Sequence, residues 1–515
     1  MATAYLNCHI KDSDDTAFLV KDSWIIKTGT NEEIQALVEE GDETVDLFGM
    51  YVTPGFVDSH MHLIGLGEYL SGLRLHTCKD SAQVLAAVRG ALDNVKEGQW
   101  LKGRGYHDDL QIDKKSLDAI SKDVPIVLVR ACGHVASANS KALELAGITP
   151  ETQVEEGEIY FDKGLVCENA IRLLQQAMPE PDEKQLQEYI RKGAQYCNAH
   201  GITAVGSDDF VSFSSNYRTP LKAFERLANQ NGITVRVNEQ CEFHDPEEFS
   251  EFLDDGYTTD VGDDFFRIGP LKLILDGSLG ARTAALTEMY SDDPGNCGIL
   301  IYDDVEVETF IRLSQSYNMP VICHAIGDAA LDQALDLFEE CQYEGNPLRN
   351  GLVHCQIMRK DQIERTLKLN LSCYIQTLFI DYDAGIVHER VGDRDKYSYP
   401  FKTLYEHVLT SNGSDAPVEL PDPLKGIELA VTRKSLSTGK TMDKKEALSV
   451  KQALDSYTND GAKQLFMDDR TGKIEEGYLA DFAVLSEDPE QCDVEKIHNI
   501  SVMMTVMDGN TVYEK

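Results

Sequence analysis

Nine short apolar runs, most of them followed by a helical segment, recur along the middle of the chain. They are TPGFVDSHMH, DVPIVLVRAC, GITAVGS, ITVRVNEQ, GPLKLILDG, MPVICHAIGD, NGLVHCQI, LNLSCYIQT and HVLTSNGSDAP. Near-continuous apolar strands that alternate with helices are typical of a parallel sheet covered on both faces. Nine runs are one more than the eight strands of a TIM-type barrel. We therefore predict an α/β fold, a (β/α)8 TIM-type barrel, with the extra run in an insertion.

The insertion is expected between the first run and GITAVGS. Roughly 140 residues separate these two runs, whereas a typical connection between consecutive barrel strands is far shorter. The barrel is therefore expected over 53–469, with a cap-like segment within about 66–200. Both chain ends have a different texture. Residues 1–52 and 470–515 contain short alternating apolar and polar runs separated by turn residues, which indicates β-structure.

The net charge of the chain limits the kinds of partner that it can bind. The 515 residues include 88 Asp and Glu against 48 Lys and Arg, a net charge of −40. Such a surface repels phosphate backbones and anionic membranes, so we expect a small-molecule substrate rather than nucleic acid or a membrane.

The twelve cysteines form no Cys-x-x-Cys pair, which is typical of reduced core residues. No apolar run is long enough for a membrane span and no signal segment is visible, which predicts a cytoplasmic protein.

Five ionisable residues stand near the carboxyl ends of the apolar runs, where a barrel keeps its active site. They are His60, His62, His324, His354 and Asp415. Two histidines at spacing two on a strand point to the same side, so both imidazoles can bind one metal. Four histidines and an aspartate at strand ends are hard to explain by packing, because burying them without partners is costly. The pattern therefore predicts a metal site.

Lys272 lies in the middle of GPLKLILDG, a run otherwise suited to full burial. A buried ammonium is costly, so this lysine must be paired, neutral or chemically modified. A lysine carbamate would be an anionic ligand between two metals. A buried ion pair with Asp276 or another carboxylate explains the residue equally well, and the sequence leaves both alternatives open.

Several long strings resemble the amidohydrolase superfamily over essentially the whole chain. They include PGFVDSHMH, SNGSDAPV and the closing TGKIEEGYLADFAVL. GHVASANSKAL, GLVCENA, LKLILDGSLGARTAAL and CHAIGDAAL are similar to the branch called amidohydrolase family 3, which includes N-substituted formamide deformylase. The resemblance implies a barrel beside a small β-sandwich assembled from both termini, and a dimer or larger homo-oligomer.

The resemblance also implies roles for the candidate residues. His60 and His62 would bind the more buried metal, His324 and His354 the second, and Asp415 would be both a ligand and the general base. Lys272, counted back to the fourth strand, would bridge the metals as a carbamate. Glu168, in GLVCENA, is an alternative bridge, or a carboxylate at a helix start. His134 and Arg282 are candidate substrate contacts, or structural residues.

The implied chemistry is hydrolysis of an amide-type carbon–nitrogen bond with one or two divalent ions, Zn²⁺ first, that activate water. A mononuclear deaminase of an aminated heterocycle is the alternative. Such enzymes usually carry Glu three residues after the fifth-strand histidine, where this chain has Gly327, with Asp328 next. A barrel kept only as a binding protein would have lost metal ligands, yet every position is filled. The motifs do not identify the substrate.

Overall fold

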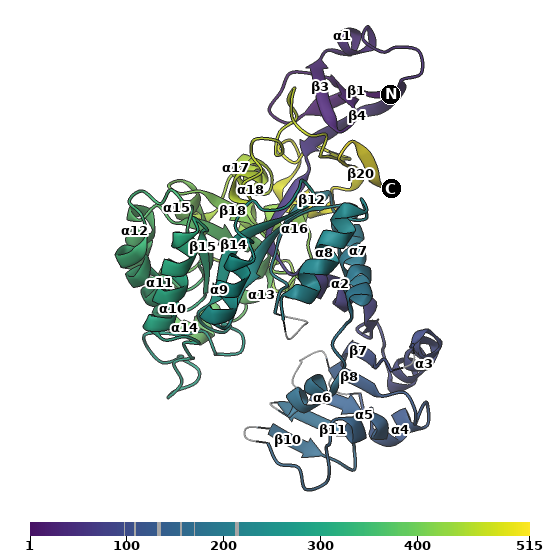
Figure 1. Cartoon of the computed structure of the whole chain (residues 1–515), viewed down its shortest axis with the longest axis vertical. Helices are drawn as coiled ribbons and strands as arrows, with labels where there is room; N and C mark the ends of the chain where they lie inside the picture. Colours follow the sequence, from purple (N-terminus) through teal and green to yellow (C-terminus); the bar gives the residue numbers. More distant parts are fainter. Residues whose placement is uncertain (97, 108–109, 131–134, 155–156, 169, 212–215) are drawn as a thin grey trace. The chain divides into compact units, whose positions relative to one another are not determined.

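The computed structural model in Figure 1 describes all residues except 97, 108–109, 131–134, 155–156, 169 and 212–215. The chain forms two compact units. One consists of Met1–Leu66 together with Leu186–Lys515, and the other of Gly67–Gln185. Both ends of the chain therefore belong to the same unit.

Eight parallel strands form the central sheet of the first unit. In spatial order they are β18 (Thr410–Asn412), β17 (Ser372–Ile375), β16 (Gly351–His354), β15 (Val321–Ala325), β14 (Phe266–Ile274), β13 (Arg236–Glu242), β12 (Ile202–Ser207) and β5 (Phe56–Met61). Eight of the nine apolar runs supply these strands, and the predicted barrel sheet is confirmed. The ninth run, DVPIVLVRAC, contains β8 (Ile126–Arg130) of the second unit.

The first and last barrel strands meet just beyond their carboxyl ends. The backbone N–H of Asp415 donates to the carbonyl of His60 at 2.8 Å, and the N–H of His62 donates to that of Ala416 at 2.8 Å. These two bonds nearly close the sheet into a barrel. They also bring the segment after β18 alongside the histidine pair of β5.

Amphipathic helices follow the barrel strands and pack their apolar side on the sheet. The principal ones are α8 (Arg218–Asn229), α9 (Pro246–Asp254), α10 (Asp304–Ser316), α11 (Asp328–Cys341), α12 (Lys360–Lys368) and α16 (Pro423–Thr432). Local sequence explains where they begin. Asp245 accepts from the N–H of Glu247 ahead of Pro246, and Asp303 forms a capping box with Glu306. Such caps satisfy backbone N–H groups that the first helical turn leaves without partners.

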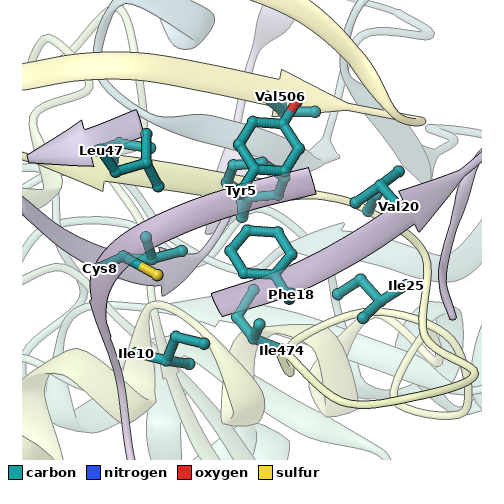
Figure 2. Close-up of a cluster of buried hydrophobic side chains, with 13 residues drawn as sticks. Tyr5, Cys8, Ile10, Phe18, Val20, Ile25, Leu47, Ile474 and Val506 are labelled. Atoms are coloured by element: carbon teal, nitrogen blue, oxygen red, sulfur yellow. The ribbon is translucent and has the colours of Figure 1, made fainter. Parts of the chain in front are cut away.

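Seven strands from both chain ends form a second sheet in the first unit. Their order is β21 (Asn510–Glu514), β20 (Val502–Met507), β19 (Phe482–Leu485), β4 (Glu43–Pro54), β1 (Ala2–Ile10), β2 (Ala17–Lys21) and β3 (Trp24–Gly29). The ring of Tyr5 stacks on Phe18 at 5.0 Å, and Phe482 meets both rings edge-on. Figure 2 shows Tyr5 and Phe18 with side chains from the carboxyl-terminal segment, such as Val506. The hydrogen bonds define one sheet, so the sandwich arrangement stays a prediction.

Because β4 ends at Pro54 and β5 begins at Phe56, the terminal sheet leads directly into the barrel. A buried ion pair fixes the junction. The guanidinium of Arg236, on β13, donates to both carboxylate oxygens of Asp481 at 2.6 and 2.9 Å. Both side chains are almost fully buried. Two-point Arg–carboxylate pairing of this kind adds geometric specificity.

The second unit is a six-stranded sheet with helices of its own. Its strands lie in the order β10 (Gly157–Tyr160), β11 (Leu165–Glu168), β9 (Val135–Ala138), β8, β7 (Leu101–Tyr106) and β6 (Leu73–Arg74). Helices α3 (Ser81–Ala91), α5 (Ser140–Leu145) and α6 (Ile171–Ala177) contribute to two apolar clusters. Throughout the described part of the chain, no helix has the length and apolar character needed to cross a membrane.

Candidate metal centre

The structure brings the five predicted residues together at the carboxyl end of the barrel. Asp415 Oδ1 lies 3.4 Å from the Nε2 atoms of both His60 and His62. The donor atoms of these three residues all lie within 4.8 Å of one another, a spacing suited to one metal ion. The ring of His354 lies 5.5 Å from that of His60 and 4.4 Å from that of His324. The four imidazoles and the carboxylate therefore form one cluster.

Two buried glutamine amides orient His60 and His354. The Nδ1 of His60 lies 2.6 Å from Gln240 Oε1, and the Nδ1 of His354 lies 2.8 Å from Gln376 Oε1. Each amide is fixed in turn, because its Nε2 donates to a backbone carbonyl, of Ser59 or of Tyr374. The amide oxygens therefore accept from Nδ1–H. This leaves the Nε2 lone pairs of His60 and His354 free to bind a metal.

The other two histidines are oriented by different acceptors. His62 Nδ1 donates to the backbone carbonyl of Asp208. His324 Nε2 lies 3.1 Å from the carbonyl of Gly277 and 3.2 Å from Asp276 Oδ1. Asp276 is fully buried, and its carboxylate also accepts three backbone N–H groups, from Ala285, Ile326 and Gly327. Each of the four imidazoles thus donates through one nitrogen and keeps the other as a potential ligand, as metal-binding histidines do.

Burial and mutual contacts shift the protonation of the cluster. Burial would raise the pKa of the Asp415 carboxyl, but hydrogen bonds with His60 and His62 hold it well below its usual range. Burial, with His324 nearby, lowers the pKa of His354 well below its usual value. Burial also disfavours the charged form of His62, yet Asp415 and the Asp208 carboxylate outweigh it and raise that pKa to about 9. Divalent metals bind imidazoles that have lost this proton, so a metal at this site would displace the proton that His62 holds between the two carboxylates.

Lys272 lies on β14, the fourth strand of the barrel, and is 1% exposed. Its Nζ lies 3.0 Å from Asp208 Oδ2 and 3.4 Å from His60 Nε2. The ammonium is therefore paired with Asp208, whereas Asp276 is used by His324. The other oxygen of Asp208, Oδ1, is buried without a hydrogen-bond partner in the described structure. This orphaned oxygen marks a place where a further donor or a cation would fit.

Comparisons with known proteins identify the family of this chain. The model of the amidohydrolase family matches residues 43–513. The chain belongs to the amidohydrolase family. It is 33% identical to the putative amidohydrolase YtcJ of Bacillus subtilis, over 98% of this chain and 97% of that protein. It is 25% identical to the N-substituted formamide deformylase of Arthrobacter pascens, over 98% of this chain and 96% of the relative. The family that the sequence strings predicted is thus confirmed.

A solved structure shares the architecture of this amidohydrolase. The structure of an uncharacterized metal-dependent hydrolase from Pyrococcus horikoshii superposes with a TM-score of 0.81 and 30% identity. The match covers 96% of this chain and 99% of that one. Metal-dependent hydrolases are therefore among the relatives with the same fold.

The structure does not test whether the three other candidate residues of this amidohydrolase reach the cluster. Arg282, in the connection after β14, donates to both oxygens of Asp292 at 3.2 and 2.9 Å, so protein contacts already engage two of its nitrogens. Glu168 ends β11 in the second unit, whose placement relative to the histidines is not defined. His134 lies outside the described residues. The roles predicted for these three stay predictions.

Sequence reasoning missed three residues that support the cluster, Asp208, Gln240 and Gln376, and it assigned Asp276 to Lys272 rather than to His324. A signal for them was present, because each lies in or directly after a barrel strand, near its carboxyl end. The same rule that selected the histidines therefore applies to neutral amides and to carboxylates that orient a ligand.

The residues of this amidohydrolase fit a divalent metal on three observations. Each of the four imidazoles uses only one nitrogen on its orienting acceptor, the Asp415 carboxylate is ionised, and Asp208 has a buried oxygen without a partner. Nitrogen and oxygen donors in this mixture suit Zn²⁺ and similar ions. The cluster thus has the donor set and the supporting hydrogen bonds of a metal centre.

Proposed function

We propose that this amidohydrolase is a metal-dependent hydrolase that cleaves the carbon–nitrogen bond of a small-molecule amide, formamide or N-acyl amine. The observation that carries the proposal is the position of Asp415, whose Oδ1 is equidistant from the Nε2 atoms of His60 and His62. A carboxylate in that position can contact both a metal and a reacting water. The formamide deformylase among the relatives supports this substrate class.

The proposed ligands divide between two metal positions. His60, His62 and Asp415 would hold one ion, and His324 with His354 would hold the second. Lys272, as a carbamate, or Glu168 would bridge the two, and Zn²⁺ is the first choice of metal. A divalent ion bound there would polarise the scissile carbonyl and make a water molecule acidic enough to attack near neutral pH.

Asp415 performs the proton transfers in this proposal. Its carboxylate accepts a proton as the water oxygen bonds to the carbonyl carbon, and later donates that proton to the nitrogen as the carbon–nitrogen bond breaks. The products are a carboxylic acid and an amine, and no other reactant is consumed. The lowered pKa of Asp415 keeps its carboxyl group ionised, which a proton acceptor requires.

The deaminase alternative requires a glutamate three residues after His324, and Gly327 occupies that position. Asp328, one position beyond the usual place of the glutamate, accepts from the backbone N–H of Thr287 at 2.9 Å and from Arg359 at 3.1 Å. Its carboxylate therefore links the start of α11 to neighbouring segments. This engagement favours hydrolysis of an acyclic or cyclic amide over deamination.

The test is a hydrolysis screen of the protein after loading with Zn²⁺. The panel contains formamides, N-acyl amines, cyclic amides and carbamates, and aminated heterocycles form a separate arm. Amine release from one amide class, abolished by a chelator and restored by metal, is the expected result. Ammonia release from the heterocycles alone would favour the deaminase, and a protein that retains no metal would contradict the proposal. Gel filtration of the same samples tests the proposed dimer or larger assembly.

A further inference from the structure

The chain leaves β16 through two consecutive residues in left-handed backbone conformation. His354 has φ of 80° and Cys355 has φ of 51°. Both side chains are buried. Left-handed angles are uncommon for residues other than glycine, and they persist where the surrounding structure holds them. The direction of the His354 imidazole therefore depends on whatever fixes this exit.

A buried hydrogen-bonded triad holds the next residue, Gln356. Its Nε2 donates to Asp383 Oδ2 at 2.8 Å and to the hydroxyl of Tyr399 at 3.2 Å. The Tyr399 hydroxyl donates to the same Oδ2 at 2.8 Å, which completes the triad. The exposed fractions of the three residues are 2%, 6% and 1%. Buried networks of this kind fix one arrangement of the groups they join.

The backbone reinforces the triad. The N–H of Tyr399 donates to the carbonyl of Gln356 at 2.7 Å, and Tyr399 itself is left-handed, with φ of 53°. The carbonyl of Tyr399 accepts from the guanidinium of Arg433 at 3.0 Å. Gln356 is thus held through both its side chain and its backbone, two residues beyond His354.

The loop that carries Asp383 also touches the imidazole. Phe379, the last residue of the short turn Thr377–Phe379, stacks on the ring of His354 at 5.9 Å with an interplanar angle of 12°. Asp383 ends α13 (Ile380–Asp383), four residues later. Residues four apart on a helical turn lie on the same side. One loop therefore contacts His354 directly and the exit from β16 through the triad.

We propose that Gln356, Asp383 and Tyr399 are positioning residues that aim His354 at the metal centre. The part of this proposal that concerns metal binding rests on the function proposed above. Asp383 accepts both hydrogen bonds through one oxygen, Oδ2. The triad therefore needs a hydrogen-bond acceptor at that position rather than a negative charge. An asparagine can supply such an acceptor, whereas an alanine cannot.

The test compares four variants with the wild-type chain. Asp383→Ala and Tyr399→Phe break the triad, and Asp383→Asn keeps its acceptor. Tyr405→Phe is the matched control, because Tyr405 donates to Asp460 at 2.7 Å. That pair lies beside a cavity of about 420 Å³ lined also by Ser372 and Thr410, the first residues of β17 and β18. It is therefore at the opposite end of the barrel.

Co²⁺ is the probe, read by competition with a chelator and by visible absorption of the bound ion. Asp383→Ala and Tyr399→Phe are expected to weaken Co²⁺ binding about tenfold, within the range known for residues that orient ligands, and to change the absorption spectrum. Asp383→Asn and Tyr405→Phe are expected to match wild type. Crystal structures of wild type and Tyr399→Phe give a readout without metal, in which the His354 ring should shift.

Each other outcome has a definite meaning. Triad variants that match Tyr405→Phe in affinity, spectrum and His354 position would overturn the inference, as would an Asp383→Asn variant as impaired as Asp383→Ala. If Asp383→Ala does not fold, the comparison of Tyr399→Phe with wild type and Tyr405→Phe tests the inference. If wild type binds no Co²⁺, the proposed function fails, and the crystallographic position of His354 still judges the triad.

Discussion

The Nδ1 of His60 lies 2.6 Å from the amide oxygen of Gln240, and a neutral group thus orients this buried imidazole. His324, by contrast, has its Nε2 3.2 Å from the Asp276 carboxylate. A carboxylate acceptor makes an imidazole more basic than an amide does. The two proposed metal positions therefore differ in the ligand strength of their histidines.

The first prediction concerns the amide oxygen of Gln240, which accepts from His60 Nδ1. Gln240→Ala leaves the tautomer of His60 unfixed, and metal affinity is expected to fall roughly 10–100-fold. Competition with a chromogenic chelator measures the change. Gln315→Ala is the control, because Gln315 is a buried glutamine that donates to the carbonyl of Cys341 within the helical layer. Equal affinities in the two variants would mean that Gln240 does not orient a ligand.

The second prediction concerns the state of Lys272. If Lys272 becomes a carbamate in the metal-loaded protein, loading is expected to require dissolved CO₂, and Lys272→Ala should lose the second ion. Added formate or acetate should restore part of the activity by replacing the bridge. Metal content and turnover are measured on the same preparations with and without bicarbonate. A crystal structure of the loaded protein with Lys272 still paired to Asp208, and Glu168 at the metals, would assign the bridge to Glu168.

The third prediction concerns stability at the junction of barrel and terminal sheet. Asp481→Ala leaves the buried guanidinium of Arg236 without its main partner, which typically costs about 3–5 kcal/mol. Glu476→Ala breaks the exposed pair with Lys27 and is expected to change stability far less, because solvent screens an exposed ion pair. Chemical unfolding of both variants gives the comparison. Similar losses would show that burial does not strengthen the Arg236 pair.

Much of this architecture follows from local sequence, and the departures have physical causes. DVPIVLVRAC has the apolar run of a barrel strand, yet β8 belongs to the second unit, because burial on both faces selects the same residues in either sheet. The sequence offers Asp276 or another carboxylate as the partner of Lys272, and Asp276 is near it along the chain. Asp208 is the partner, brought from the end of β12 by the barrel topology.

The metal cluster was easier to predict than its supports. Four histidines and an aspartate at strand ends together carry a signal, whereas Gln240 and Gln376 are ordinary polar residues until the fold places them against an imidazole. The triad around Gln356 is less visible still. Its three members span 43 positions, from Gln356 to Tyr399, and they meet through the loops after β16 and β17.

The fourth prediction concerns pH and uses Asp383. Burial raises the pKa of this carboxyl to about 7, although its hydrogen bonds with Tyr399 and Gln356 act in the opposite direction. The folded state therefore holds this proton at pH values where the unfolded chain has released it, so the contribution of Asp383 to stability declines as pH rises from about 4 to about 7. Asp383→Asn cannot ionise. Its melting temperature minus that of wild type should increase over this interval and then level off, and a difference independent of pH would contradict the assignment.

The last prediction separates metal binding from proton transfer at Asp415. In Asp415→Asn, the amide oxygen can still reach a metal, and the four histidines keep their supporting hydrogen bonds, so metal content is expected to change little. An amide cannot accept the proton of the attacking water, however. Loss of a general base typically lowers the rate by roughly 10²–10⁴-fold, and turnover of a substrate found in the screen should fall by that factor. His62→Ala is the reference for lost metal. An Asp415→Asn variant that kept more than about a tenth of wild-type turnover at full metal content would place the base elsewhere, with His134 the next residue to test.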